Sequence, residues 1–214
     1  MIKLAITCNA ANYGGKRAKK VKYIVVHYTA NNGDTARGNG SYFQRTPGLG
    51  ASAHWFVDEK EAVLSVPEDF VAWHCGVANY VHPECRNSNS IGVELCSRRD
   101  KDGEFYFLPE TVDNAVELIR ELMEKYGVPP ERVIRHYDVT NKICPAPFVG
   151  AGPWREFLNM LVRYDRPEDV PEWGKETVKK LMERNILRGD GQKLDLSYDM
   201  LRILVLLDRT GSFG

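Results

Sequence analysis

Several features that would narrow the function of a protein are missing from this 214-residue sequence. Lys and Arg together number 29, Asp and Glu also number 29, and the formal net charge is therefore zero. A neutral balance argues against a nucleic-acid-binding protein, because that class usually carries a marked basic excess. No apolar run approaches the roughly 20 residues that a membrane-spanning helix needs, so we expect no insertion into a membrane.

Cysteines are few, and they lack the spacing of a disulfide framework. The sequence holds five of them, namely Cys8, Cys75, Cys85, Cys96 and Cys144. The N-terminus shows no signal peptide, because the apolar stretch at residues 4–6 is short and the basic cluster at residues 16–20 follows it instead of preceding it. We therefore expect synthesis in the cytoplasm and reduced thiols, any of which is a possible metal ligand.

Strand and helix patterns alternate along the first three quarters of the chain. Residues 21–28 form a β-branched run that is apolar on both faces, which is typical of a central strand covered by helices. Further strands are predicted at 52–58, 62–66 and 90–96, the first two as a hairpin, with an extended segment at 132–137 and helices at 35–46, 109–126 and 154–164. This order predicts an α/β fold with a mixed central β-sheet flanked by helices.

A shorter helical part follows a stretch rich in proline and acid. We interpret residues 165–171 (DRPEDVP) as a linker between a catalytic domain at 1–165 and a helical module at 166–214. The module carries one helix pattern over Trp173, Val178, Leu181 and Ile186, a turn at 188–191, and a second pattern over Leu196, Leu201, Leu204, Val205 and Leu207. So short a piece is near the lower limit for independent folding, and we expect it to dock or to form homo-oligomers.

Two histidines and one cysteine have the composition of a catalytic zinc site. His27 lies at the end of a buried strand pattern, His136 follows an extended run, and Cys144 comes eight residues later. Three protein ligands leave one zinc position open for water, whereas a structural zinc would need four ligands, usually with paired C-x2-C motifs. Taken alone, either histidine could be a core or surface residue, and the thiol could be a buried apolar cysteine.

The order of five motifs favours the zinc site over these alternatives. They are HYT at 27–29, SAHWFVD at 52–58, AWHCG at 72–76, NSIGVELC at 89–96 and H-x5-K-x-C-P at 136–145. Together they resemble the zinc-dependent N-acetylmuramoyl-L-alanine amidases of the type-2 group, which include phage endolysins and bacterial autolysins and are related to peptidoglycan recognition proteins. The resemblance spans roughly residues 20–165. It implies one Zn²⁺ ion on His27, His136 and Cys144, and hydrolysis of the peptidoglycan amide bond between N-acetylmuramic acid and L-alanine.

The resemblance also implies two catalytic residues. Glu94 matches the acidic residue of the autolysin-like branch, and we expect it to act as general base and acid. Lys142 matches the family's catalytic lysine and would stabilise the oxyanion. From the pattern alone, the carboxylate could equally form a salt bridge on a partly wet sheet face, and the lysine could be a solvated loop residue. One departure is Ala53, which stands where the lysozyme-like phage branch has a catalytic tyrosine.

Four residues are candidates for substrate contact. His74 lies in the AWHCG motif, which the resemblance places at the groove wall, although a satisfied structural histidine is equally compatible with the pattern. Asn89 could bind a peptide stem or fix its own loop. Thr29 follows the ligand strand and offers a small polar group, whereas Tyr28 could line the site or point into the core.

Two other functions remain compatible with the sequence. One is a peptidoglycan-binding protein without turnover, against which Cys144 and Glu94 speak because recognition proteins typically lack the cysteine ligand. The other is a zinc peptidase that acts on the stem peptide. The segment after 165 resembles modules that follow phage lysin catalytic domains, which implies cell-wall attachment or oligomerisation. The expected partner is bacterial peptidoglycan, reached after release from the cell.

Overall fold

A six-stranded mixed sheet forms the centre of the computed structural model, which describes residues 1–189 and 193–213. The strand order is β1-β5-β4-β7-β3-β10. The bounds are β1 Ile2–Ala5, β3 Tyr23–Tyr28, β4 Trp55–Val57, β5 Glu61–Leu64, β7 Ser90–Leu95 and β10 Val133–Arg135. The four strands β4, β7, β3 and β10 run parallel, and β5 is antiparallel to β4. The strands predicted at 21–28 and 90–96 and the predicted hairpin are therefore present.

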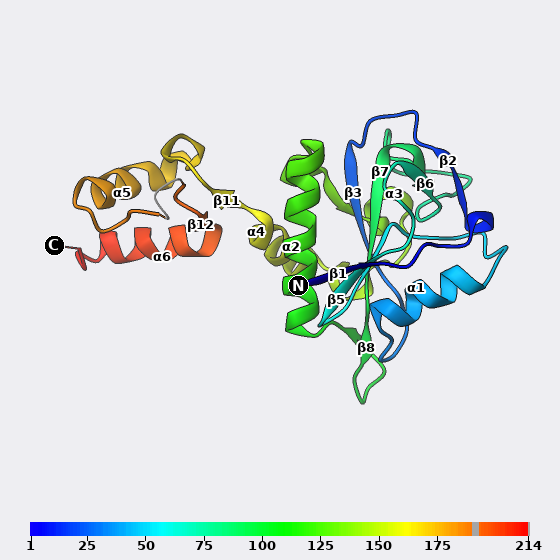
Figure 1. Ribbon diagram of the computed structural model, residues 1–214. Helices are drawn as coiled ribbons and strands as arrows, with labels where there is room; N and C mark the ends of the chain where they lie inside the picture. The colour runs from blue at the N-terminus through cyan, green and yellow to red at the C-terminus, as the bar shows by residue number, and fades with distance from the viewer. Residues whose placement is uncertain (190–192, 214) are drawn as a thin grey trace. The chain divides into compact units, whose positions relative to one another are not determined.

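Helices cover both faces of this sheet, which confirms the predicted fold class. Helix α2 (Pro109–Tyr126) lies on one side, and α1 (Ala36–Arg45) lies on the other (Figure 1). The bounds of α2 match the prediction because strong signals mark both ends. A proline begins it, where a missing N–H costs nothing, and Gly127 ends it in the left-handed region at φ 62°.

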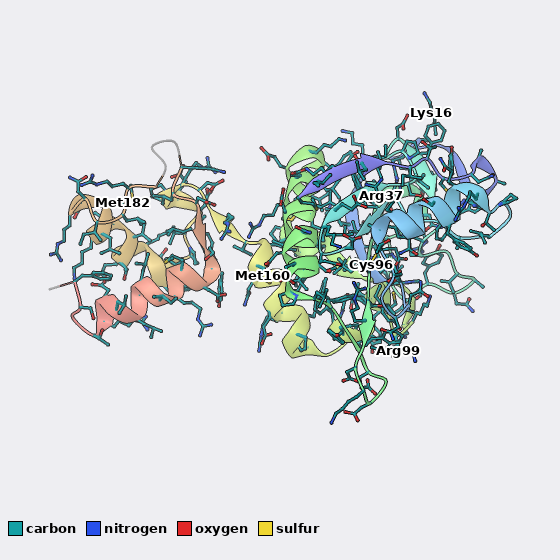
Figure 2. The ribbon with its side chains drawn as sticks, turned by 60° about the horizontal axis from the view of Figure 1, so that its bottom comes forward. Lys16, Arg37, Cys96, Arg99, Met160 and Met182 are labelled. Carbon is teal, nitrogen blue, oxygen red and sulfur yellow. The ribbon has the colours of Figure 1, made fainter. Side chains whose placement is uncertain are left out.

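Buried apolar side chains join α1 to the sheet. Ala36 of α1 packs with Phe56 of β4, Val63 of β5 and Cys96, all of them at most 2% exposed. Figure 2 shows Cys96 within this layer. Full burial of a side chain such as phenylalanine or valine contributes about 1.5–3 kcal/mol. Cys96 is thus a small core residue.

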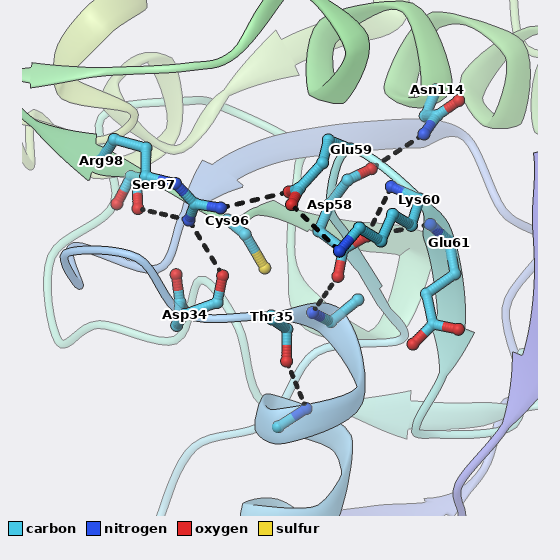
Figure 3. Close-up of polar contacts among 12 residues, drawn as sticks. Asp34, Thr35, Asp58, Glu59, Lys60, Glu61, Cys96, Ser97, Arg98 and Asn114 are labelled. Carbon is cyan, nitrogen blue, oxygen red and sulfur yellow. Dashed lines mark hydrogen bonds and ion pairs between the residues drawn. The ribbon is translucent and has the colours of Figure 1, made fainter.

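The carboxylate of Asp58 connects the β4–β5 hairpin to α1 (Figure 3). One oxygen accepts the backbone N–H of Ala36 at 2.8 Å, and the other accepts those of Lys60 and Glu61 at 2.8 and 2.9 Å. Asn114 of α2 donates to the Asp58 carbonyl oxygen at 2.9 Å. Asp58 therefore satisfies backbone N–H groups of the hairpin turn and of the N-terminus of α1. Its carbonyl oxygen also binds α2, which lies on the opposite face of the sheet.

The structure corrects the prediction after β10. Residues 136–137 were expected to be extended, but α3 (His136–Thr140) begins at His136. The reason is a cap three residues later, because the Asp138 carboxylate accepts the backbone N–H of Arg135 at 2.8 Å and also binds its guanidinium. The edge strand β1 was not expected either. Two short strand pairs complete this part, β2 Tyr13–Lys16 with β6 Phe70–Ala72 and β8 Arg98–Arg99 with β9 Phe105–Tyr106. Short 3-10 turns lie at Ala10–Asn12, Asn87–Asn89, Pro130–Arg132 and Ala146–Phe148.

The chain divides into two compact units, Met1–Trp154 and Arg155–Gly214. Helix α4 (Ala151–Leu161) crosses the division, which lies before the stretch at 165–171 suggested as a linker. The second unit then contains β11 Arg163–Tyr164, a 3-10 turn Pro167–Asp169, α5 Glu172–Glu183, β12 Leu196–Ser197 and α6 Tyr198–Arg209. Its core consists of Val170, Val178, Leu194, Leu196, Leu201 and Val205.

Two details of the second unit differ from the helix patterns. Leu196 lies in β12 instead of a helix, and Ile186 lies beyond the end of α5 with 48% of its surface exposed. The turn expected at 188–191 lies partly outside the described residues. Across the ranges that the structure describes, no helix has both the length and the apolar character that spanning a membrane requires.

Candidate metal centre

The two candidate histidine ligands lie where neighbouring parallel strands end. His27 is the penultimate residue of β3, and His136 directly follows β10, which pairs with β3. The carboxyl ends of parallel strands meet at one edge of a sheet, which is where sites in such folds are usually built. The two imidazole rings consequently approach each other, with centroids 4.7 Å apart.

A tight loop returns Cys144 to the same edge. Asn141 ends α3 in the left-handed region at φ 62°, a conformation that asparagine tolerates better than most residues. The backbone N–H of Tyr137 then donates to the Cys144 carbonyl oxygen at 2.8 Å, which ties the loop back onto α3. The spacing of eight residues between His136 and Cys144 therefore spans one short helix and one turn.

The three side chains are close enough to share one ion. Their ligand atoms all lie within 4.8 Å of one another, and Cys144 Sγ is 3.6 Å from His27 Nδ1. Ligand atoms around a tetrahedral zinc are about 3.3–3.6 Å apart at ordinary bond lengths. In addition, His136 Nδ1 is buried and has no hydrogen-bond partner among the described residues. A donor set of two imidazoles and one thiol, with an unpartnered nitrogen, fits zinc.

Burial sets the protonation of these ligands. It lowers the pKa of His27 well below its usual value, with the neighbouring His136 as a smaller cause. Burial and then the Lys142 ammonium lower the pKa of His136 to about 4. Both rings are thus neutral at pH 7 and have a lone pair to donate. Burial also raises the pKa of the Cys144 thiol to about 12, so binding of a metal ion must displace its proton.

Glu94 lies beside the ligand cluster on the adjacent strand. It is the register partner of His27 across β3 and β7, and its Oε1 is 4.0 Å from His27 Nδ1. Its Oε2 is buried and, among the described residues, has no hydrogen-bond partner. Burial raises the pKa of this carboxyl to about 8, and the nearby Lys142 opposes that rise. The Glu94 side chain is 20% exposed, and its ionic neighbour at 4.0 Å, His27, is neutral at pH 7 because burial lowers the pKa of that ring.

Two cavities meet at Lys142. The first has a volume of about 540 Å³ and is lined by Glu94, Tyr28 and Thr29, among others. The second has a volume of about 470 Å³ and includes His136 in its wall. Lys142 lines both and is itself exposed. A substrate on either side of the ligand cluster would therefore pass this ammonium group.

Of the four expected substrate contacts, Tyr28 and Thr29 line the first cavity. The Tyr28 ring packs edge-on against Phe105, with centroids 5.1 Å apart. The Thr29 hydroxyl donates to Asp34 at 3.1 Å and accepts the backbone N–H of Ser97 at 3.3 Å. Tyr28 is thus presented to a ligand, whereas Thr29 is partly occupied by its own loop.

His74 and Asn89 are placed differently. His74 lines the second cavity, but its side chain is only 9% exposed and its two ring nitrogens already contact His27 and Ser90. The Asn89 amide accepts the backbone N–H of Arg86 at 2.7 Å and donates to the Glu84 carbonyl oxygen at 3.1 Å. Asn89 therefore fixes its own loop, which is one of the two roles that the sequence left open.

Several residues of the site were not anticipated from the sequence. Ser90 contacts His74, and Trp73 and Gly50 line the second cavity. Trp73 adjoins His74 in the AWHCG motif, and that position is the signal that could have found it. Ala53, at the position of the expected tyrosine, is 1% exposed in the layer beneath α1.

Comparison with known proteins identifies the family. The family model described as N-acetylmuramoyl-L-alanine amidase matches residues 17–147. The chain is 41% identical over 158 residues to the N-acetylmuramoyl-L-alanine amidase CwlL of Bacillus licheniformis, a match that covers 70% of this chain and 42% of that protein. The chain belongs to the N-acetylmuramoyl-L-alanine amidase family. The resemblance that the five motifs indicated is therefore confirmed.

Further relatives agree in sequence and in fold. BlyA of Bacillus subtilis is 38% identical over 159 residues, which cover 67% of this chain and 41% of that protein. The catalytic domain of XlyA has a TM-score of 0.64 at 27% identity, covering 76% of this chain and all of that domain. PlyL has a TM-score of 0.61 at 31% identity, with 75% and 97% covered. The matches to CwlL and BlyA span only about two fifths of those proteins' own length.

Proposed function

We propose that this member of the amidase family hydrolyses the bond between N-acetylmuramic acid and L-alanine in bacterial peptidoglycan, with one zinc ion. The observation that carries the proposal is the meeting of His27, His136 and Cys144 within 4.8 Å, beside a Glu94 carboxylate 4.0 Å from His27. Three ligands are the set of a catalytic zinc site rather than a structural one. The adjoining cavities offer room for glycan and peptide.

Zinc at such a site acts as a Lewis acid and makes water nucleophilic at neutral pH. The chain must then supply proton transfer. Glu94 is suited to that role because it lies next to the ligands and its Oε2 has no other partner within the described part of the chain. A zinc ion held by the neighbouring ligands would lower the raised pKa of the Glu94 carboxyl and favour its ionised form. The carboxylate would then accept the proton of the attacking water, and as an acid it would pass that proton to the leaving amide nitrogen.

Lys142 is suited to stabilise charge on the substrate. It lines both cavities and stands two residues before the Cys144 ligand. As the carbonyl carbon becomes tetrahedral, negative charge develops on its oxygen, and a donor held in place lowers that barrier. We propose that the Lys142 ammonium donates to this oxygen.

The bond that is cleaved can be identified from the products. Purified full-length protein would be incubated with defined muropeptides, with zinc, with a chelator, and with zinc restored after chelation. The proposal expects peptides with a free L-alanine amino end and intact muramic acid, only when zinc is present. Peptides cut within the stem would instead identify a zinc peptidase. Binding to walls without any product would identify a receptor.

Two variants separate zinc binding from chemistry. Glu94→Gln and Lys142→Ala should retain about one zinc per chain and lose turnover by about 100-fold or more, as is usual for groups that transfer protons or stabilise an oxyanion. Cys144→Ala should instead lose the metal. Unchanged turnover of Lys142→Ala with full zinc content would remove this lysine from the mechanism.

We further propose that the second unit attaches the enzyme to the cell wall. Its position after the amidase domain supports this role, and so do the exposed apolar side chains of α6 at Met200, Ile203, Leu206 and Leu207. Cosedimentation of the full chain with purified walls tests attachment. Sedimentation velocity without walls tests the alternative, which is association with a second copy.

A further inference from the structure

A buried chain of hydrogen-bonding atoms runs from the His27 ligand into the protein interior. His27 Nε2 lies 3.0 Å from His74 Nδ1, and His74 Nε2 lies 3.1 Å from the Ser90 hydroxyl. The Ser90 hydroxyl in turn donates to the Arg86 carbonyl oxygen at 2.8 Å. His27 is 1% exposed, His74 is 9% exposed and Ser90 is fully buried. Both contacts of the His74 ring are therefore buried.

The last atom of the chain fixes the direction of every bond in it. A carbonyl oxygen only accepts hydrogen bonds, so the Ser90 hydroxyl donates its one proton to the Arg86 carbonyl oxygen and must accept from His74. A neutral His74 that donates through Nε2 has a bare Nδ1, which accepts the N–H of His27. His27 then has its proton on Nε2 and its lone pair on Nδ1. That nitrogen is the one that faces Cys144 Sγ at 3.6 Å.

The fold holds His74 in this position. A Cβ atom at Gly92 would lie 2.5 Å from His74 Cγ, so the ring occupies space that only a glycine on β7 leaves open. The ring planes of His74 and His27 meet at 89° with centroids 5.1 Å apart, a T-shaped contact. The backbone N–H groups of His74 and Cys75 both donate to the Asn87 side chain, at 3.2 and 2.8 Å. The loop before the ring is thus fixed as well as the ring.

We infer that His74, backed by Ser90, is a positioning residue that holds His27 in the tautomer with its lone pair on Nδ1 and thereby strengthens zinc binding. The inference rests on the proposed function in that it takes zinc as the resident ion. Partners of this kind orient a ligand and fix its tautomer, and their loss typically weakens metal affinity by about 10–100-fold. His74 also lines the second cavity, but both of its ring nitrogens are engaged within the protein, so we assign it to the support of His27.

Zinc affinity of the full chain, measured by competition with a chromophoric chelator, tests this inference. His74→Phe keeps a ring but offers neither donor nor acceptor, and we expect zinc affinity to fall by about 10–100-fold. His74→Gln offers one acceptor and one donor, and it should recover most of that loss. Ser90→Ala should weaken affinity less than His74→Phe, because the ring remains. As a control, His82→Asn keeps a side-chain acceptor for the backbone N–H groups of Glu84 and Cys85, and it should match the wild type.

A second measurement guards against a merely structural effect. The absorption bands of the Co²⁺-substituted protein report the ligand geometry, and they should shift in His74→Phe but return in His74→Gln. If His74→Phe fails to fold, the other three proteins still test the inference, because zinc affinity should be highest in the wild type and lower in both His74→Gln and Ser90→Ala. Equal zinc affinity in all variants, or a His74→Gln protein as weak as His74→Phe, would overturn it. If the variants show the expected order of zinc affinity but the zinc-loaded wild type releases no product from muropeptides, the proposed function is wrong and the inference about His74 stands.

Discussion

Removal of zinc should destabilise the first unit, Met1–Trp154, and leave the second unit unchanged. The proposed ligands His27, His136 and Cys144 are distant in the chain, so an unfolded chain does not hold them together. An ion that binds only the folded state adds about 2.7 kcal/mol when its free concentration is 100 times Kd. In a unit of this size 1 kcal/mol moves Tm by about 2–4 °C, so chelation should lower Tm by about 5–11 °C.

The chain contains its own control for this experiment. Every histidine and cysteine of the sequence lies at or before Cys144, so the second unit offers neither imidazole nor thiol. Calorimetry gives Tm, and hydrogen exchange followed by mass spectrometry resolves the two units. Zinc should slow exchange in peptides from β3 and β10 but not in those from α5 and α6. A shift that persists in Cys144→Ala, or slower exchange in α5 and α6, would refute the reasoning.

Two further predictions concern stability away from the metal. Burial raises the pKa of the Glu68 carboxyl, but hydrogen bonds from a lysine, a tyrosine and a tryptophan outweigh that effect, so its folded pKa lies below the ordinary value. The ionised Glu68 carboxylate therefore stabilises the folded protein above pH 4.5, and this contribution is lost as the pH falls through the folded pKa. Glu68→Gln should lower the free energy of unfolding by about 1–3 kcal/mol at pH 7 and by less at pH 3, as measured by urea unfolding. An equal loss at both pH values would contradict this prediction. In the second unit, a Cβ at Gly174 would lie 2.9 Å from Leu201 Cδ1, so Gly174→Leu should cost about 1–3 kcal/mol, seen as faster hydrogen exchange in α5 and α6 with β3 unaffected. Unchanged hydrogen exchange in α5 and α6 of Gly174→Leu would contradict the prediction, because it would show that the two helices accommodate the larger side chain without loss of stability.

The elements that the sequence predicted well are those whose signals are local and strong. Helix α2 has proline at its start, glycine after its end and an apolar repeat between them, and its observed bounds match the prediction. Strand β3 is equally clear as a run of β-branched residues. By contrast, β1 pairs only with β5 at the sheet edge and is mostly exposed, so its residues carry no continuous apolar signal. Its strand conformation comes from pairing with a distant segment, which local patterns do not encode.

The site shows the same division between local and distant information. Motif order was sufficient to bring together His27, His136 and Cys144 as a proposed ligand set, because each motif carries its own residue type and spacing. The contact between His74 and His27 lies across 47 positions of sequence and depends on two strands and a loop packing together. No pattern within AWHCG shows on which side of the sheet edge the imidazole points. The sequence therefore placed His74 at the groove wall, where it does line the second cavity, but it gave no sign of the contact with His27.

One row of side chains on β7 explains why the site needs this strand in its observed register. Residues two apart on a strand share a face, so Ser90, Gly92 and Glu94 all point to the side that His27 faces. Along that row, Ser90 accepts from His74, Gly92 leaves the space for the His74 ring, and Glu94 reaches the ligand cluster. A slip of one residue against β3 would present Ile91 and Val93 to the site instead, both of which are now fully buried on the other face. The alternation of small or polar with apolar residues in SIGVEL therefore suits the proposed metal site on one face and the core on the other.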